Sequence, residues 1–216
     1  MNTINKTYVD ALLADAAYVE GLFDGMTKFE LNGVLANRMT PTLAKFISEK
    51  FEIVSHKESN DILGSGFDAT VWRGVAGSEF AGQVFVSMRG TEGAQDIVSD
   101  VDLALPFGIA KRQIVSMVNW WNQITTPTTG QAAQIQLVPI LGTAIPAPTV
   151  AGTGTLTLSG AVQVVGHSLG GHLASAFARL MGDHSGVGGV PIAGVTTFNS
   201  AGFTAGSITR GRIVFH

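Results

Sequence analysis

A serine set among glycines, between an apolar run and a stretch of small residues, constrains the fold of this chain more than any other feature. Residues 166–170 read Gly-His-Ser-Leu-Gly and fit the pattern G-x-S-x-G, with Ser168 at the centre. Ala161–Val165 before them has the composition of a buried strand, and Leu169–Met181 after them is typical of a helix. The sequence therefore predicts a strand, a sharp turn and a helix, which together present a nucleophilic serine.

The residues around Ser168 have the sizes that such a turn requires. The turn strains the serine backbone, and the strand and helix nearly touch, so Gly166 and Gly170 leave room for both. Leu169 begins the helix, and its backbone N–H is expected to face an oxyanion. We expect His167 to support the turn.

A second oxyanion donor is expected from the loop that follows another strand. The strand-like run Gln83–Arg89 continues into Gly90-Thr91-Glu92, where Gly90 permits a tight exit from the sheet. Thr91 can then offer its backbone N–H, and also its hydroxyl, to the oxyanion that Leu169 faces.

The composition fits a single globular domain. The chain has 216 residues, of which 45% are hydrophobic, and this is enough to bury a core. Only 13% are charged, and the net charge of −3 gives no basis for nucleic acid as a partner. The chain has no cysteine, which excludes disulfides and thiolate metal sites.

The first residues do not have the pattern of a secretory signal. Asp10, Asp15 and Glu20 interrupt the apolar part of this stretch, and no apolar run in the chain is long enough to span a bilayer. The localisation stays open between the cytoplasm and export by a route that needs no leader.

The order of the expected elements indicates an α/β fold. An opening amphipathic helix would bury Tyr8, Leu12, Ala16, Val19 and Phe23 on one face, and a second helix begins at Thr40-Pro41. Strands and helices alternate after that, which predicts a mostly parallel sheet flanked by helices on both faces. The expected strands are 51–56, 67–73, 83–89, 161–165, 195–198 and 212–215, and further helices are expected at 93–105 and 110–124.

One long segment carries no charge. From Gln113 to Ala178 the chain has no Asp, Glu, Lys or Arg, and residues 125–160 are rich in Thr, Gly, Pro and aliphatic side chains. The simpler interpretation of this uncharged insertion is a hairpin or loop packed on the body of the domain. The alternative is an apolar surface that contacts lipid or a partner.

Three motifs together resemble the class 3 lipase family, the fungal-type triacylglycerol lipases and their bacterial relatives. They are VFVSMRGTE, VVGHSLGGHLA and TTFNSAG, and the similarity extends over residues 51–216. The resemblance implies an α/β-hydrolase fold and a serine hydrolase that cleaves carboxylic esters of acylglycerols or phospholipids without a cofactor. It also implies Ser168 as the nucleophile, with Leu169 and Thr91 as the oxyanion donors.

The resemblance further implies a lid over the site at residues 91–108. Asp100 lies where the family keeps an acid that steadies this region, although a solvated helix face explains the same residue equally well. The family often has Asn-Trp where this chain has Asp96-Ile97, so the contacts of a closed lid do not carry over directly. A lipid or ester substrate, at a membrane or lipid-droplet surface, is the expected partner.

The remaining members of a catalytic triad are harder to find. In this fold the acid and then the histidine follow the serine, and after Ser168 the chain offers Asp183, His172, His184 and His216. Asp183-His184 follows the helix after the serine, which puts the pair on the order of 20 Å away. His172 lies on the helix behind the nucleophile and is expected to pack there or bind water.

The acid and the base are therefore expected beyond His216. On this interpretation residues 1–216 are a single, partial α/β-hydrolase domain, incomplete at the C-terminal end, and its own missing C-terminal segment is a further expected partner. The chain alone would then have little activity. Two alternatives stay open: an esterase, thioesterase or peptidase on the same fold, and a catalytically incomplete fragment that binds lipid or a protein partner.

Overall fold

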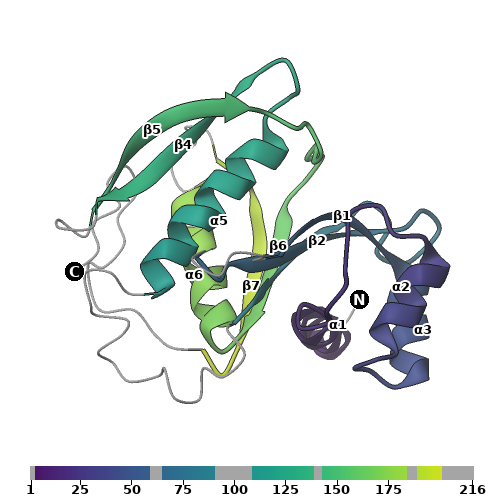
Figure 1. Ribbon diagram of the computed structural model, residues 1–216. Coiled ribbons are helices and arrows are strands. Elements are labelled where there is room, and N and C mark those ends of the chain that lie inside the picture. Colours follow the sequence, from purple (N-terminus) through teal and green to yellow (C-terminus); the bar gives the residue numbers. More distant parts are fainter. Residues whose placement is uncertain (1–2, 59–64, 91–108, 139–142, 184–188, 201–216) are drawn as a thin grey trace.

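A five-stranded sheet forms the centre of the protein (Figure 1). The computed structural model describes residues 3–58, 65–90, 109–138, 143–183 and 189–200. The strand order in the sheet is β1-β2-β3-β6-β7. The strands are β1 (Phe51–Lys57), β2 (Asp68–Gly74), β3 (Val84–Arg89), β6 (Val162–His167) and β7 (Ile192–Phe198).

The sheet is mixed, so the expectation of a mostly parallel sheet needs correction. β2 pairs antiparallel with both β1 and β3, whereas β3 pairs parallel with β6, and β6 parallel with β7. The reason lies in the connections. The first three strands follow one another as a meander, whereas the chain passes through a long helix before β6, as a parallel crossover requires. The fold is of the α/β type.

Two helices cover one face of the sheet, α5 (Ile109–Thr125) and α6 (Leu169–Met181) (Figure 1). They lie in one hydrophobic core with side chains of β2, β3 and β6, including the fully buried Val86 and Val164. Trp121 of α5 and Phe177 of α6 meet edge to face, with ring centroids 4.7 Å apart. This core holds α6 against the strand that leads to Ser168.

The other face is covered by α1 (Thr3–Ala16), α2 (Lys28–Leu35) and α3 (Pro41–Lys50) (Figure 1). Leu13, Leu31 and Ile47 from these helices share a second core with Trp72 and Val165 of the sheet. Because Val164 and Val165 point to opposite cores, the strand before Ser168 is apolar throughout.

The N-terminal helix is shorter than predicted and buries a narrower face. It ends at Ala16, and of the expected face Tyr8 and Phe23 are 54% and 49% exposed. After Ala16 the chain continues in tight turns. Residues from there to Phe23 therefore do not extend the helical face that the sequence predicts. The α2 helix was not predicted from the sequence, although a capping box between Thr27 and Glu30 begins it.

The α3 helix begins as predicted. The Thr40 side chain accepts a hydrogen bond from the Leu43 N–H, and Pro41 occupies the first helical position. Both features match the pattern from which the start of this helix was predicted.

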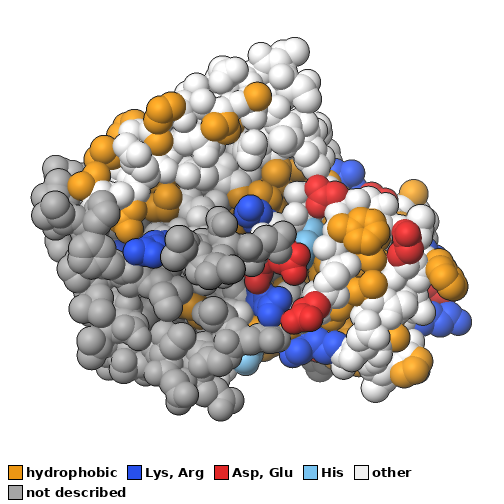
Figure 2. Space-filling view, viewed as in Figure 1, with side chains coloured by type: hydrophobic (Ala, Val, Ile, Leu, Met, Phe, Trp, Pro, Cys, Tyr) orange, Lys and Arg blue, Asp and Glu red, His pale blue; other side chains and the backbone are white. Residues whose placement is uncertain are grey.

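The uncharged segment forms an antiparallel hairpin of β4 (Gln131–Val138) and β5 (Thr143–Ala151). The hairpin lies on α5, where the Asn119 side chain exchanges two hydrogen bonds of 2.8 Å with the backbone of Ile135. Figure 2 shows its outer surface as hydrophobic and uncharged polar atoms. No helix among the described residues has the length and apolar character needed to cross a membrane.

Candidate active site

Ser168 has a strained backbone at the junction of β6 and α6. Its φ of 55° and ψ of −127° lie where side chains other than glycine are rarely found. Such a conformation costs on the order of 1–3 kcal/mol and persists only where the surrounding structure enforces it. Strand, sharp turn and helix follow one another here as the sequence pattern predicts.

The hydrogen bonds of the Ser168 backbone fix this conformation. Its N–H donates to the Phe198 carbonyl at the end of β7, over 2.9 Å. Its own carbonyl accepts from the N–H groups of Gly171 and His172, over 2.9 and 3.3 Å. The neighbouring strand and the first turn of α6 therefore hold the turn from two sides, and the side chain of Ser168 is not needed as a helix cap.

The two glycines of the motif are required by close backbone contacts. A Cβ on Gly166 would overlap the Gly170 carbonyl, because strand and helix nearly touch there as expected. A Cβ on Gly170 would overlap the Met88 carbonyl of β3, so this glycine makes room for a different strand from the one assumed in the sequence analysis. The first turn of α6 thus packs directly on the backbone of β3.

The start of α6 offers backbone donors beside Ser168. Within the described residues, no acceptor is bonded to the N–H of Leu169 or of Gly170. Free N–H groups and the dipole at the start of this 13-residue helix favour a negative charge at this point. The role of Leu169 as an oxyanion donor stays a prediction.

The second expected donor, Thr91, lies outside the described residues, as do Asp100 and the whole candidate lid at 91–108. Gly90, just before Thr91, lies against the turn around Ser168. A Cβ on Gly90 would be 3.2 Å from the Gly170 nitrogen and 3.3 Å from the His167 carbonyl oxygen. The end of β3 therefore reaches the turn, and Thr91 stays a prediction.

Tyr18 joins the end of β3 to the turn. Its hydroxyl accepts a hydrogen bond from the Gly90 N–H at 3.0 Å and donates one to the His167 carbonyl at 3.1 Å. The ring of His167 packs edge-on against the ring of Tyr18, with centroids 6.0 Å apart. Burial raises the pKa of Tyr18, so the hydroxyl stays neutral and able to donate.

Arginines hold the ring of Tyr18 in place. The guanidinium groups of Arg38 and Arg89 lie 5.2 and 5.7 Å from the ring centroid, within the range of cation–π contacts. Arg89 also forms a 3.6 Å ion pair with Asp68 on the neighbouring strand. In the segment Arg89-Gly90-Thr91, the arginine thus fixes the end of β3, and the glycine allows the close approach to the turn.

The described acids and histidines do not complete a triad. No histidine nitrogen in the described part of the chain is hydrogen-bonded to Ser168 Oγ, and His172 is buried on α6. Asp183 follows the far end of α6, about 20 Å from Ser168 by the rise of the helix. His184 and His216 lie outside the described residues.

The residues that hold the turn from other elements were not predicted from the sequence. Tyr18 is 149 positions from His167 in the chain, and no local pattern marks it. Phe198 lies in the TTFNSAG segment, but its contribution is a backbone carbonyl, which every residue type has. Only the packing of α1 and β7 beside β6 reveals either role.

The described residues contain no group of three or more His, Cys, Asp or Glu side chains that could hold a metal ion. Comparisons of the chain with protein-family models, with curated proteins and with solved structures gave no match.

Replacing Gly170 by alanine tests the contact between α6 and β3. The added methyl group must displace the Met88 backbone, so Gly170→Ala should lower the free energy of unfolding in urea by about 3 kcal/mol. Gly33→Ala is the matched control, because Gly33 lies in open space on α2. This variant should be about 0.5–1 kcal/mol more stable than the unaltered chain. Equal stability of the two variants would contradict the close contact.

Replacing Tyr18 by phenylalanine tests the link between β3 and the turn. Tyr18→Phe leaves the Gly90 N–H without its partner, so unfolding in urea should require about 1–2 kcal/mol less free energy. Tyr8→Phe removes the other tyrosine hydroxyl of the chain, from a side chain that is 54% exposed, and should change stability by less than about 0.5 kcal/mol. If both variants behave alike, the hydroxyl of Tyr18 has no special structural role.

Proposed function

We propose that this protein is a serine hydrolase of carboxylic esters with an α/β-hydrolase architecture. The observation that carries the proposal is the strained conformation of Ser168 between a buried strand and the free N-terminal amides of α6. Backbone strain of this kind lowers stability and is typical of functional sites, where it is part of the mechanism. The motif around Ser168 is the one that α/β-hydrolases use to present a nucleophile.

In the proposed reaction, the Ser168 oxygen attacks the carbonyl carbon of the ester. The negative charge that develops on the carbonyl oxygen is stabilised by the Leu169 N–H and, as predicted, by Thr91. Collapse of this intermediate expels the alcohol and leaves an acyl group on Ser168, which water then removes as the acid. The hydroxyl proton of Ser168 passes through a general base to the departing alcohol.

The proposal requires a histidine base, with its acid partner, from outside the described residues. His172 is buried on α6, and Asp183 lies at the other end of that helix. Neither therefore supplies the proton transfer that a serine nucleophile needs. Ser168, Leu169 and the end of β3 are the parts of the mechanism that the described residues contribute.

Lipid esters are the proposed substrates within this class. The resemblance of the three sequence motifs to class 3 lipases supports acylglycerols or phospholipids. The uncharged outer surface of the hairpin is compatible with contact to a lipid surface (Figure 2). A thioesterase or short-chain esterase would instead prefer thioesters or esters of short acids, so a series of acyl lengths distinguishes these enzymes.

The activity should depend on the Ser168 hydroxyl. Hydrolysis of 4-nitrophenyl butyrate and of an emulsified long-chain acylglycerol is measured for the 216-residue chain, for Ser168→Ala and for Ser159→Ala. Ser168→Ala should lower the rate about 1,000-fold or more, since it removes the nucleophile. Ser159, which is exposed in a loop, should be replaceable without effect. Full activity in Ser168→Ala, or a loss of activity in Ser159→Ala as large as in Ser168→Ala, would contradict the proposal.

A further inference from the structure

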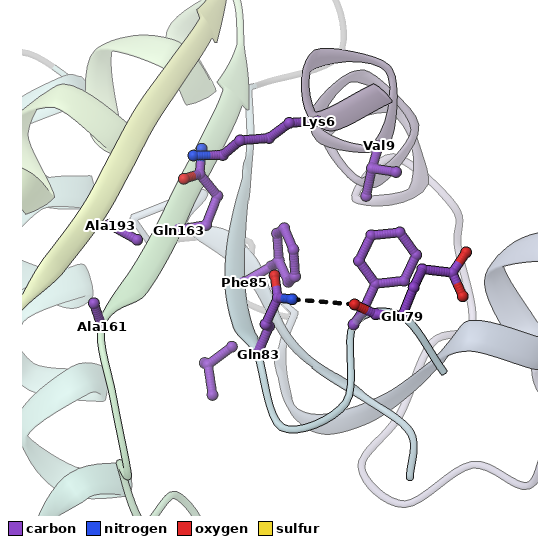
Figure 3. Close-up of a pocket in the computed structure, with 10 residues that line it drawn as sticks. Lys6, Val9, Glu79, Gln83, Phe85, Ala161, Gln163 and Ala193 are labelled. Atoms are coloured by element: carbon purple, nitrogen blue, oxygen red, sulfur yellow. Dashed lines mark hydrogen bonds between the residues drawn. The ribbon is translucent and has the colours of Figure 1, made fainter. Parts of the chain in front are cut away.

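A cavity lies at the opposite end of strands β3 and β6 from Ser168. It has a volume of about 430 Å³ and opens between the first residues of β3, β6 and β7 and the helix α1 (Figure 3). This volume falls within the range of small-molecule sites. Gln163 lines the cavity five positions before Ser168 on β6, which corresponds to about 16 Å of strand. The cavity is therefore separate from the candidate active site.

Gln163, which lines this cavity, belongs to a buried polar cluster. Gln163 is 4% exposed, and its Nε2 donates to Asp10 Oδ2 over 3.0 Å and to Thr196 Oγ1 over 3.2 Å. Asp10 is 1% exposed, and its Oδ2 also accepts the Thr196 hydroxyl proton over 2.6 Å. Residues from α1, β6 and β7 are thus tied together at one point.

This cluster fixes the orientation of the Gln163 amide. A carboxylate oxygen accepts hydrogen bonds, so the NH2 group, and not the carbonyl oxygen, faces Asp10. The Gln163 Oε1 is therefore turned away, and in the described part of the chain neither it nor Asp10 Oδ1 has a hydrogen-bond partner. A buried acceptor without a donor is costly, so Gln163 Oε1 is an open position for a ligand donor.

Lys6 provides a donor close to this acceptor. A Cβ added to Gly194 would lie 3.2 Å from Lys6 Nζ and 2.8 Å from Gln163 Oε1. These two atoms are therefore at most about 6 Å apart. Figure 3 shows the Lys6 side chain extending from α1 toward Gln163. A single ligand oxygen between the two can donate to Gln163 Oε1 and accept from Lys6 Nζ.

The walls around these polar atoms are largely apolar. Val9, Phe80, Phe85, Ala161 and Ala193 line the cavity. The acidic residue of the rim, Glu79, is already paired with Lys50 over 2.8 Å. The cavity therefore offers an apolar wall, one buried acceptor and one cation.

We propose that this cavity binds a small neutral alcohol with an apolar body. Its hydroxyl would donate to Gln163 Oε1 and accept from Lys6 Nζ, while the hydrocarbon part contacts Phe80 and Phe85. A carboxylate has no proton to donate to Gln163 Oε1, and an ammonium group would be repelled by Lys6. A water molecule can satisfy the same two atoms but leaves the apolar wall hydrated. The proposal does not depend on the hydrolase function.

Titration with ligands of equal chain length tests the proposal. 1-Hexanol, hexanoate and hexylammonium are added to the ¹⁵N-labelled 216-residue chain, and the side-chain NH2 signals of Gln163 are followed by NMR. 1-Hexanol should shift these signals with a dissociation constant in the millimolar range. Hexanoate and hexylammonium should bind about tenfold more weakly or not at all, because each loses one of the two polar contacts.

Three variants test whether the binding takes place in the cavity. Ala193→Trp should fill the cavity and abolish the shifts caused by 1-hexanol, whereas Ala151→Trp, at the exposed end of β5, should leave them unchanged. Lys6→Met should weaken the binding of 1-hexanol about threefold or more. Absence of any shift at Gln163, equal binding of hexanoate, or unchanged binding in Ala193→Trp would each overturn the proposal.

Discussion

The close contact of the first turn of α6 with β3 and β6 determines the rest of the candidate site. Gly166 and Gly170 allow backbone to meet backbone, so the helix begins directly above two parallel strands. Because α6 begins directly after β6, the chain must turn within one residue, and the Ser168 backbone adopts a strained conformation. The free N–H groups at the start of the helix come to lie beside the serine for the same reason.

Two elements distant in sequence stabilise this contact. β7 accepts the Ser168 N–H through the Phe198 carbonyl, and Tyr18 connects Gly90 to the His167 carbonyl. The turn at Ser168 is therefore held by β7 and by the segment that follows α1, as well as by the first turn of α6.

The part of the site that depends on local geometry could be predicted from the sequence. The glycines around Ser168, the apolar strand before it and the helix after it are neighbours in the chain, so their pattern indicated the turn. The direction of β2 and the exposure of Tyr8 and Phe23 could not be predicted in this way, because they depend on how the chain turns between elements. The role of Tyr18 depends on a contact across 149 positions, for which a single sequence has no local signal.

The most direct test of the account is covalent labelling of Ser168. The folded chain is treated with a fluorophosphonate, a reagent that modifies activated serine hydroxyls, and its peptides are analysed by mass spectrometry. The account predicts one modified site, Ser168, and no modification after unfolding in urea, since the reactivity requires the folded turn together with the base that acts on Ser168. A folded chain in which Ser168 stays unmodified, or in which other serines react equally, would contradict it.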